Sequence, residues 1–583
     1  MKKSVGIFGA GIAGLSCAHE LAIAGYDVNV YESSDSIGGM AKSYRYPNGL
    51  PSENSWRGYG QFYKNIFHIM RQIPSPTSEP SNANSSVGAN AVAFDKCPTL
   101  KLGKYKTVYD TELSRPIQFI LPKDDIDNPD DAYNWTKNFT LKDWIVILMQ
   151  MFREMAADER INYYAEINAM EYLKQKINPR NLTYIVSVFG PWSGIDWQRT
   201  SLHHITNFFR MIQYPDLSTP YIHDADIDGP AWTHGAGDQW LVLKRPTSES
   251  WFDPWAKVLT ECYNVKFHFN HSLRKLNFLN GKINSTVIQT NSNLITVRHD
   301  YYIIATTPFA IKDIVDRSGI LAQTDPQLKL FKELIADGPH IQISFRIGFK
   351  EKIVTPQKYM AFILPDSEYN ITFYFQDTIW HDNVYLGPGN KTLISGGACV
   401  SYVPGKLFNK TTTEVSDQEF KDEILFQMFR CKNLNSVIAN SNNGKKLSDF
   451  DINVFEIWKG WNFNPKFAID VNEQKWVNST HTNLFMPETK TSFPNLFLAG
   501  SHIKSSIDLY TMETACATGR DAAFMIINKN QKALVVNKPI WMNILGKIDN
   551  MLYAVNLPNI VDLTLFMLGC IIIFYLISLS KKT

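Results

Sequence analysis

The chain has 583 residues, of which 44% are hydrophobic and 20% are charged, and its formal net charge is +2. This length suffices for two or three domains with sizeable cores. The near-neutral charge argues against nucleic acid as the main partner, because no basic stretch interleaved with aromatic residues is present. The seven cysteines are scattered and form no CxxC or Cys/His cluster, so we expect neither a metal site nor a disulfide framework.

The first 32 residues predict a nucleotide-binding unit. An apolar strand at 5–8 enters a turn containing Gly9, Gly11 and Gly14, and a helical pattern follows. A second strand then ends in Glu32, about twenty residues after the turn. In this pattern the glycines allow a tight turn, close approach to a pyrophosphate and close helix packing, and the acid accepts from a ribose hydroxyl. A glycine-rich turn without a ligand is the alternative, and the register of strand, helix, strand and acid disfavours it.

A double glycine, Gly38 and Gly39, follows Glu32 after a short loop. Here the sequence resembles the flavin-containing amine oxidase and phytoene desaturase superfamily, in which this element packs along FAD. Residues 50–63 look most like the hydroxysqualene-dehydroxylase-like branch of that superfamily. The resemblance returns in residues 494–502 and 508–520, where the family has a last strand and a last helix whose N-terminus faces the flavin. The resemblance therefore implies FAD as the cofactor.

The resemblance also implies a set of cofactor-binding residues. They are Gly9, Gly11, Ala13, Gly14, Glu32, Gly38, Gly39, Met40, Lys42, Arg57, Gly500, Ser501, Thr511 and Met512. We add Glu513 on the same grounds, at the start of the last helix. Ser501 departs from the family, where many relatives carry an acid at this position. Arg57 contacts either FAD or a polar substrate group, or it pairs with a nearby acid.

We expect dissociable FAD, because no cysteine before Phe493 is positioned like the covalent attachment of monoamine oxidases. The sequence nominates no catalytic acid or base. His203 and His204 are adjacent and diverge, so a structural role is favoured over metal binding. Trp458, Trp461 and Trp476 line either a substrate pocket or the core.

The family order predicts an α/β fold with a discontinuous Rossmann-type FAD-binding domain, an inserted α+β substrate domain and a C-terminal transmembrane helix. The predicted segments are 1–75 (FAD-binding), 76–224 (inserted helical region), 225–310 (FAD-binding), 311–479 (substrate domain), 480–530 (FAD-binding) and 531–583 (linker and anchor). Asn280-Gly281 predicts a hairpin turn, with residues 283–297 as its second arm. Strands are expected near 341–347, 371–375 and 393–395, and a helix at 417–430.

The inserted helical region is rich in aromatic residues, notably at 141–155. Such a region suits a hydrophobic substrate, but we expect its Trp and Phe stripes to belong to the core. Residues 74–88 have low complexity and predict a mobile surface loop.

The C-terminus predicts a membrane anchor. Residues 563–579 are apolar and free of charge, which is just long enough to span a bilayer. A buried core helix is the alternative, and the lack of a polar face disfavours it. Residues 540–553 are amphipathic and suit the bilayer interface. No signal peptide is expected before the first strand, so we expect a single-pass anchor with the catalytic domain in the cytosol, although the topology stays open.

Three functions remain open. The first is a membrane-anchored FAD-dependent oxidoreductase that moves a hydride from a hydrophobic, isoprenoid or lipid-like small molecule to flavin N5. The second is a flavin amine oxidase that makes aldehyde and hydrogen peroxide, which a buried lysine and an aromatic cage would favour. The third is a non-catalytic FAD-fold scaffold at a membrane. The sequence does not identify the substrate, the electron acceptor or the oligomeric state.

Overall fold

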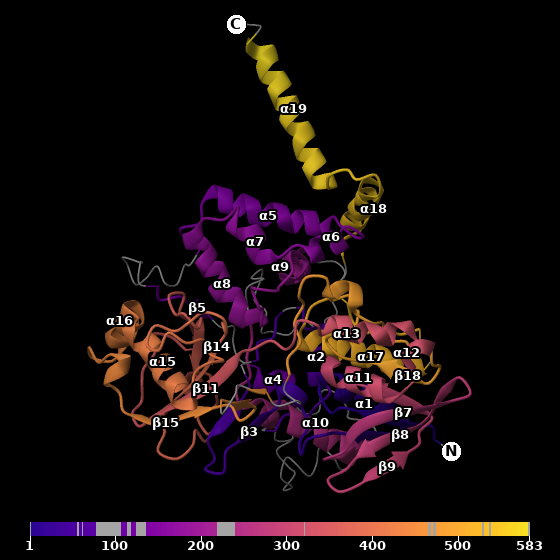
Figure 1. The fold of residues 1–583 in the computed structure, drawn as a ribbon. Helices are drawn as coiled ribbons and strands as arrows, with labels where there is room; N and C mark the ends of the chain where they lie inside the picture. Colours follow the sequence, from indigo (N-terminus) through magenta and orange to yellow (C-terminus); the bar gives the residue numbers. More distant parts are fainter. Residues whose placement is uncertain are drawn as a thin grey trace.

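The computed structural model describes residues 2–54, 57–60, 62–76, 106–113, 118–123, 136–217, 240–319, 321–358, 360–463, 468–469, 474–527, 530–535 and 538–580. Figure 1 shows a nucleotide-binding part, a second sheet beside it, a layer of helices above both, and one long helix that projects from the top. Most of the predicted loop at 74–88 lies outside the described residues.

The nucleotide-binding part is built on a five-stranded parallel sheet in the order β18-β10-β1-β2-β6. Its strands come from three distant stretches of the chain, within the predicted segments 1–75, 225–310 and 480–530. They are β1 (Ser4–Phe8), β2 (Asp27–Tyr31), β6 (Lys266–His268), β10 (Tyr301–Ile304) and β18 (Leu496–Leu498). A mixed α/β fold with a discontinuous Rossmann-type domain is therefore present, as the sequence predicts.

Two helices pack together on this sheet, α1 (Ile12–Ile23) and α17 (Met512–Ile527). They approach closely at Gly519, where an added Cβ would lie 2.2 Å from the carbonyl oxygen of Ala13. Only a glycine fits there, and the approach brings the N-termini of both helices to one side of the sheet. The helix α2 (Lys64–Met70) also packs on α17.

A β-meander follows β6 and consists of β7 (Ser272–Leu279), β8 (Lys282–Gln289) and β9 (Leu294–Val297). Asn280 and Gly281, with φ of 51° and 77°, form the turn between β7 and β8 as the sequence predicts. The expected single arm at 283–297 is wrong, because the chain turns again after Gln289 to form β9. The helices that follow β10 are α11 (Pro308–Arg317), α12 (Leu321–Thr324) and α13 (Leu330–Leu334).

The second sheet has six strands in the order β15-β11-β14-β13-β12-β5. They are β5 (Gln118–Ile120), β11 (Ile343–Phe349), β12 (Met360–Ile363), β13 (Ile371–Phe375), β14 (Thr392–Ala398) and β15 (Ile452–Ile457). The β12–β5 pair is parallel and the other four pairs are antiparallel, and α15 (Asp417–Arg430) and α16 (Lys432–Ser441) accompany the sheet. Three of these strands and α15 lie where the sequence predicts them. Their buried side chains form a core of their own.

Several short elements complete these parts. They are β3 (Ser43–Arg45), β4 (Pro51–Glu53), α4 (Val108–Glu112), α10 (Asp253–Lys257), α14 (Gln376–Ile379), β16 (Trp461–Asn462) and β17 (Ala468–Ile469). Cys262 lies just after α10 and is disulfide-bonded, which differs from the expectation of unpaired cysteines. The thiols of Cys17, Cys399, Cys431 and Cys516 are free and buried.

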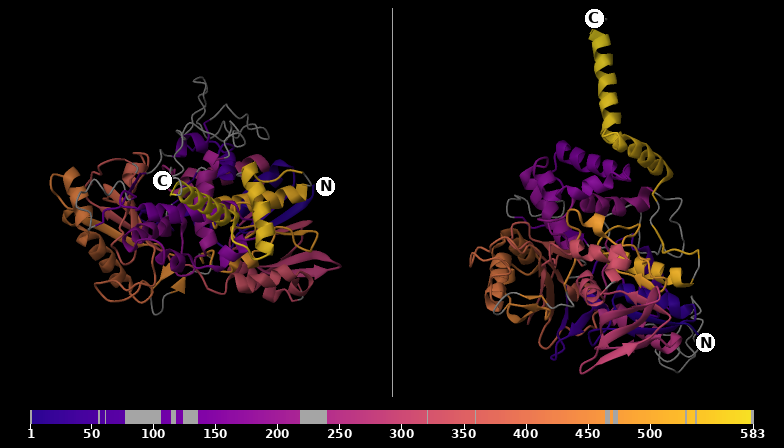
Figure 2. Two further views of the ribbon diagram at one scale, coloured as in Figure 1. Left: turned by 90° about the horizontal axis from the view of Figure 1, so that it is seen from above. Right: turned by 45° about the vertical axis from the view of Figure 1, so that its right-hand side comes forward.

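The helical layer consists of α5 (Leu141–Met155), α6 (Ile161–Glu166), α7 (Ala169–Lys174), α8 (Pro179–Ser193) and α9 (Leu202–Leu217). The chain ends in α18 (Ile540–Ala554) and α19 (Ile560–Ser580). Figure 1 and the right view of Figure 2 show that α19 projects away from the body. Its residues 560–577 are long and apolar enough to cross a membrane, and none of that stretch is buried, so a core helix is excluded.

Candidate functional site

One cavity of about 600 Å³ begins at the glycine turn after β1 and reaches the boundary with the second sheet. Its lining includes Gly9, Gly11, Ala13, Glu32, Gly38, Gly39, Met40, Arg57, Gly500, Ser501, Thr511 and Met512. These are twelve of the fourteen predicted cofactor residues, and they come from the first and the last segment of the parallel sheet, while the middle segment adds lining residues that were not predicted, such as Ala305 and Thr306. The tertiary fold therefore brings most of the predicted set to one cavity.

The glycine turn is shaped for close approach of a ligand. Gly9 has a φ of 106°, which favours glycine, and its amide donates to the carbonyl of Tyr31 at 2.8 Å. Gly14 does not line the cavity, since it faces the turn, where an added Cβ would lie 1.9 Å from the carbonyl oxygen of Gly9. At Gly11 the nearest atom to an added Cβ is 3.8 Å away, so its backbone borders open space. This is the division of roles that the motif predicts.

The carboxylate of Glu32 lies against the glycine turn. One carboxylate oxygen accepts from the Ala10 amide at 2.7 Å, and the other accepts from the Ser34 amide at 2.9 Å. The hydroxyls of Ser33 and Ser34 also donate to Oε1, at 3.2 and 2.9 Å. The side chain is buried yet lines the cavity, and Oε2, the oxygen bonded to the Ala10 amide, keeps a lone pair that can accept from a ribose hydroxyl.

The double glycine and Arg57 border the same cavity. Gly38 and Gly39 have φ of 102° and 55°, and the Gly38 amide donates to Ala10 O at 2.8 Å. The Arg57 guanidinium donates to the carbonyl of Met40 at 2.6 Å, which ties this segment to the double-glycine loop.

Lys42 differs from the expectation of a pyrophosphate contact. It is absent from the cavity lining, and its ammonium donates to Ser34 Oγ at 3.1 Å. The reason is the extended backbone at Lys42, which ends the short helical turn at 39–41 and leads the chain into β3. Lys42 thus supports the loop that follows Glu32.

The start of α17 faces the cavity through Thr511 and Met512. Gly500 adopts a φ of 154°, and its amide donates to Thr518 Oγ1 of α17 at 3.0 Å. A helix N-terminus presents unpaired N–H groups and a positive dipole end, which suits an electron-rich ligand edge.

Glu513 does not line the cavity, so the structure does not bring it together with the other predicted cofactor residues. Its carboxylate accepts from the amides of Asn65 and Ile66 at 2.7 and 3.0 Å, at the start of α2. Burial raises its pKa to about 7, against the opposing effect of these hydrogen bonds.

The residues present fit a flavin dinucleotide. Two helix N-termini and the glycine turn open onto one elongated cavity, and Glu32 lies at its nucleotide end. The hydroxyl of Thr306, which also lines the cavity, is buried and has no hydrogen-bond partner in the part of the chain that the structure describes. A ligand in the cavity would supply the missing partner of this hydroxyl.

At its other end the cavity meets a cluster that the sequence did not reveal. Lys475 is half-buried beside Gly194, and its ammonium donates to Gln342 Oε1 at 3.2 Å. Gln342 in turn donates to the Cys399 sulfur at 3.1 Å. Burial lowers the pKa of Lys475 to about 8, and the positive charge of Arg57 adds to this effect.

Aromatic side chains form the adjoining wall of the cavity. Phe208 of α9 and Trp240 are stacked with their ring centroids 5.8 Å apart, and Trp461 also lines the cavity. Trp476 belongs to the core instead, since its indole donates to Leu334 O at 2.9 Å. Trp458 is also buried and absent from the lining.

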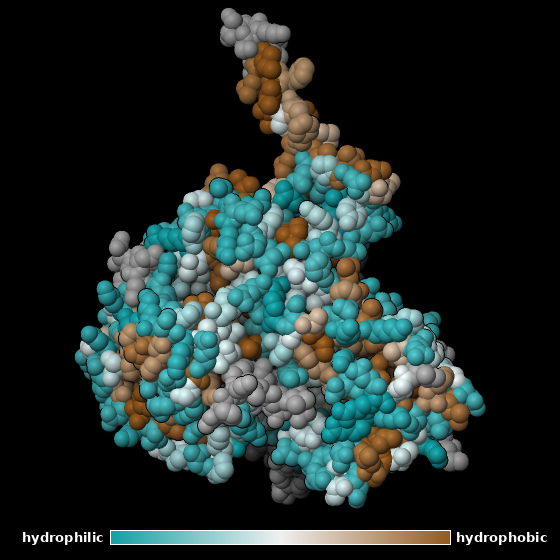
Figure 3. All heavy atoms as spheres, in the orientation of Figure 1, coloured by the Kyte–Doolittle hydropathy of each residue, from teal (hydrophilic) through white to brown (hydrophobic). Residues whose placement is uncertain are grey.

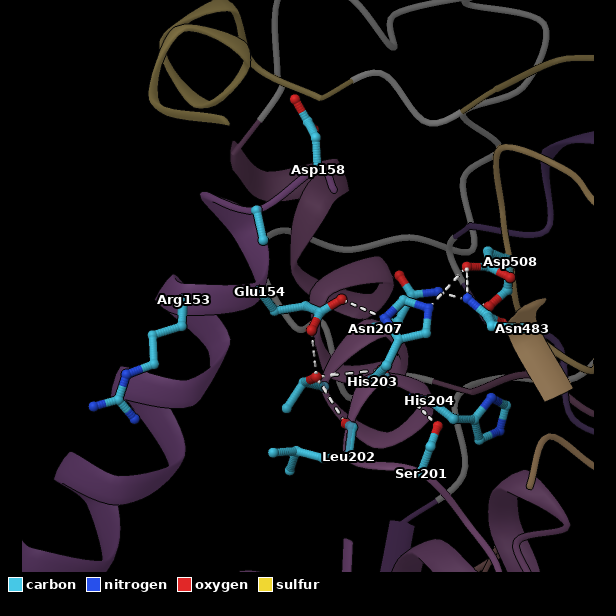
Figure 4. A network of polar contacts seen from close by, with 12 residues as sticks. Arg153, Glu154, Asp158, Ser201, Leu202, His203, His204, Asn207, Asn483 and Asp508 are labelled. Carbon is cyan, nitrogen blue, oxygen red and sulfur yellow. Dashed lines mark hydrogen bonds and ion pairs between the residues drawn. The ribbon is translucent and has the colours of Figure 1, made fainter. Parts of the chain in front are cut away.

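A buried polar network connects the helical layer to the loop before α17 (Figure 4). His203 of α9 bonds Glu154 of α5 at 2.5 Å through Nδ1 and Asp508 at 2.8 Å through Nε2. Asn207 of α9 donates to the carbonyls of Ile507 and Asp508 at 3.0 and 2.7 Å. Asp508 itself has a φ of 50°, so these bonds hold an unusual backbone conformation three residues before Thr511.

The two histidines have opposite protonation. Burial alone would lower the pKa of His203, but the charges of Glu154 and Asp508 raise it to about 10. Burial lowers the pKa of His204 to about 3, and the charge of His203 adds to this. Among the described residues no group of His, Cys, Asp and Glu side chains suits a metal ion.

The nucleotide half of the site was visible in the sequence, whereas Lys475, Gln342 and the Glu154–His203–Asp508 network were not. These residues share no motif and come from separate segments. The only available signal was chemical, namely polar residues within otherwise apolar stretches, such as Glu154 in α5.

Comparison with known proteins agrees with this geometry. Residues 7–73 match the family model of NAD(P)-binding Rossmann-like domains, and residues 261–527 match that of flavin containing amine oxidoreductases. Zeta-carotene desaturase from Capsicum annuum is 38% identical over 72 residues, which is 12% of each chain. A flavin-dependent L-tryptophan oxidase from Lentzea aerocolonigenes is 45% identical over 47 residues, 8% of this chain and 10% of that protein. The aligned part is thus a small fraction of these relatives' length.

Solved structures resemble the fold along most of the chain. Cyclohexylamine oxidase from Brevibacterium oxydans has a TM-score of 0.53 at 14% identity, covering 91% of this chain and 99% of that one. An oxidoreductase from Methanosarcina mazei has a TM-score of 0.54 at 13% identity, covering 90% and 100%. The glycine turn, the acid, the shared cavity and the family-model matches support assignment to the flavin-containing amine oxidase and phytoene desaturase superfamily of FAD-dependent oxidoreductases.

Proposed function

We propose that this protein is a membrane-anchored oxidoreductase that removes a hydride from a hydrophobic, uncharged substrate of isoprenoid or lipid-like character. The observation that carries the proposal is the far end of the cavity, where Phe208, Trp240 and Trp461 form an apolar wall. The two carboxylates among the described lining residues are Glu32, at the glycine turn, and Asp313, on α11. A cationic substrate would need a counter-charge near the aromatic wall, whereas a neutral hydrocarbon does not.

FAD, when bound, supplies the hydride acceptor. The chain's own residues then orient the substrate and exclude water. Among the described residues at the aromatic end, Lys475 has a pKa of about 8, so its neutral amine can accept a proton from the substrate carbon next to the one that loses hydride. A desaturation needs this second loss, because removal of hydride alone leaves a carbocation.

The test is anaerobic reduction of the full-length protein in detergent micelles. Long-chain isoprenoids should bleach the visible flavin absorbance, and primary amines should not. The flavin should stay in the supernatant after acid precipitation, since we propose that it is dissociable. Absence of any flavin, or no bleaching by either class, would overturn the proposal.

Amine oxidation is the second candidate, and the specific observation in its favour is the half-buried Lys475 beside an aromatic wall. It predicts bleaching by primary amines and stoichiometric hydrogen peroxide after oxygen is admitted. The third candidate, a non-catalytic scaffold, predicts bound flavin that neither class of donor reduces.

We propose further that α19 crosses the bilayer as a single anchor, with the catalytic domain in the cytosol. The apolar stretch at 560–577, none of which is buried, supports the span. The disulfide at Cys262 is the observation against a cytosolic location, because disulfides persist mainly in oxidising compartments.

The orientation has a direct test at Asn138, which is exposed and precedes Phe139 and Thr140 in a glycosylation sequon. A cytosolic domain gives no glycosidase-sensitive mass shift in eukaryotic cells. A shift that disappears in Asn138→Gln would place the domain in the lumen instead. Asn478, in another sequon, is buried and would not be modified in the folded protein.

A further inference from the structure

The helix α5 is inverted with respect to an ordinary surface helix. Its buried side chains include Asp143, Gln150 and Glu154, which are at most 4% exposed. Its exposed face carries large apolar side chains instead, which are Leu141, Trp144, Ile145, Leu148 and Phe152. A helix in water normally places these two classes of side chain the other way round. The sequence-based expectation that the stripe at 141–155 belongs to the core is therefore wrong for these five residues.

The inversion is fixed by specific bonds of the polar side chains to the rest of the helical layer. Asp143 accepts from the Asn178 amide at 2.9 Å and from Asn181 Nδ2 at 2.8 Å, both at the start of α8. Gln150 accepts from the Tyr172 hydroxyl of α7 at 3.1 Å. Glu154 bonds His203 of α9, as described above. Rotation of α5 to bury its apolar face would break all of these bonds, so that face stays outward.

The outward face of α5 lies next to the proposed membrane span. Arg153, at the end of α5, forms an ion pair of 2.6 Å with Asp562 in the first turn of α19. In Figure 1 α5, α18 and the start of α19 lie at the same end of the molecule, and Figure 3 shows hydrophobic residues there, continuing along α19.

The helix α18 adds a second apolar face at this end. Its Ile540, Trp541, Ile544 and Met551 are exposed, while Met542, Gly546 and Asp549 are buried. A buried ion pair of 2.8 Å between Asp549 and Arg160 holds α18 against the helical layer. The exposed apolar residues of α18 and α5 therefore belong to one rigid end of the protein.

We propose that the exposed apolar face of α5, together with that of α18, rests in the interface of the lipid bilayer that α19 crosses. Three observations favour lipid over another protein chain. The face is continuous with a helix long enough to span a bilayer, and the Arg153–Asp562 pair links the two. Each helix presents a tryptophan, Trp144 and Trp541, a residue enriched at membrane interfaces. Lys142 and Lys547 are exposed on the same helices, as is common for interfacial helices.

This inference rests on the membrane part of the proposed function and adds a docking surface to it. Phe208 of the cavity wall lies on α9, and α9 is bonded to α5 through His203 and Glu154. The surface that contacts lipid and the proposed substrate end of the cavity thus share one helical layer. A hydrophobic substrate dissolved in the bilayer would lie close to that layer.

The experiment uses the full-length protein in phosphatidylcholine vesicles, with a solvatochromic amino acid placed by stop-codon suppression. The probe replaces Leu148 on α5 in one variant, Leu294 on β9 as the matched control in a second, and Ile572 on α19 in a third. All three side chains are exposed, and β9 lies at the end of the body opposite α5 in Figure 1. Lipids with spin-labelled acyl chains quench only probes in contact with the bilayer.

We expect blue-shifted emission and strong quenching at positions 148 and 572, and water-like, unquenched emission at 294. Water-like emission at 148 with quenching at 572 would overturn the docking surface and leave the anchor standing. Blue-shifted but unquenched emission at 148 would mean that a protein surface, such as a second copy, covers α5, which also overturns the proposal. Loss of quenching at both 148 and 572 would overturn the span as well. The proposed oxidoreductase activity is tested separately, by flavin reduction, so its failure can be told apart from failure of the docking surface.

Discussion

Replacement of His203 by glutamine tests whether the Glu154–His203–Asp508 network holds the helical layer on the flavin domain. The variant leaves two carboxylates facing a neutral amide, one of them fully buried and the other with its side chain 19% exposed. At about 1.4 kcal/mol for each pH unit, the rise of the His203 pKa from 6.5 to about 10 corresponds to at most about 5 kcal/mol. Removal of one partner of a buried ion pair costs about 3–5 kcal/mol, so the two values agree.

The pH dependence gives the sharper test. The folded pKa of His203 is raised, so its contribution is complete below the unfolded value of about 6.5 and declines as the pH rises toward about 10. The pKa of Asp508 is lowered in the folded protein: burial opposes this, but His203 outweighs it. Its contribution is therefore lost at acidic pH, below about 4. The network stabilises most between these two limits.

The assay is urea unfolding in detergent micelles, followed by tryptophan fluorescence at several pH values. His204→Gln is the matched control, because His204 is equally buried but neutral, and we expect it to cost only about 1 kcal/mol. We expect His203→Gln to cost about 3–5 kcal/mol near pH 6, with the deficit shrinking toward pH 10. Equal costs for the two variants, or a deficit that does not change with pH, would refute the reasoning.

Three further predictions concern the cavity. Gly14→Ala forces a Cβ against the Gly9 carbonyl oxygen, which lies 1.9 Å from that position. We expect the free energy of unfolding to fall by about 1–3 kcal/mol and the variant to retain less FAD on gel filtration. Unchanged FAD retention would contradict the close packing. Glu32→Gln removes a charged acceptor, and we expect FAD affinity to fall by about 10-fold or more, measured by equilibrium dialysis; an unchanged affinity would exclude Glu32 from the ribose contact. Burial lowers the pKa of Lys475 to about 8, so the rate of flavin reduction should rise through about pH 8 and lose that step in Lys475→Met, with spectra and FAD affinity unchanged. Persistence of the same step in the variant would assign it to another group.

The nucleotide half of this protein could be predicted because its determinants are local. Gly9, Gly11 and Gly14 lie within one turn, and the strand, helix and acid that frame them follow at short, regular spacings. Gly9 has a φ of 106°, and Gly14 has no room for a Cβ, so backbone sterics favour glycine at both positions. The two glycines in the sequence therefore indicate this turn geometry. The apolar stretch at 560–577 is equally local, because length and composition alone decide whether a helix can span a bilayer.

The differences between expectation and structure at Lys42, Glu513 and α5 have one common cause. Sequence position predicts which residues lie near an element, but not which neighbour a side chain meets. Lys42 is hydrogen-bonded to Ser34, and Glu513 to the start of α2. Glu154 is bonded to His203, which lies more than forty residues further along the chain. In α5 the polar partners on α7, α8 and α9 decided which face is buried, which reversed the expectation from hydropathy.

The sequence alone therefore determined the cofactor class, the Rossmann-type unit and the candidate anchor. The tertiary structure alone decided which end of the cavity is aromatic, that Lys475 lines it there, and that α5 turns its apolar face outward. The physical reason is the range of the interactions. Turn geometry and helix hydropathy are set within a few residues, whereas burial, pKa shifts and ion pairs depend on partners that only the folded chain brings together.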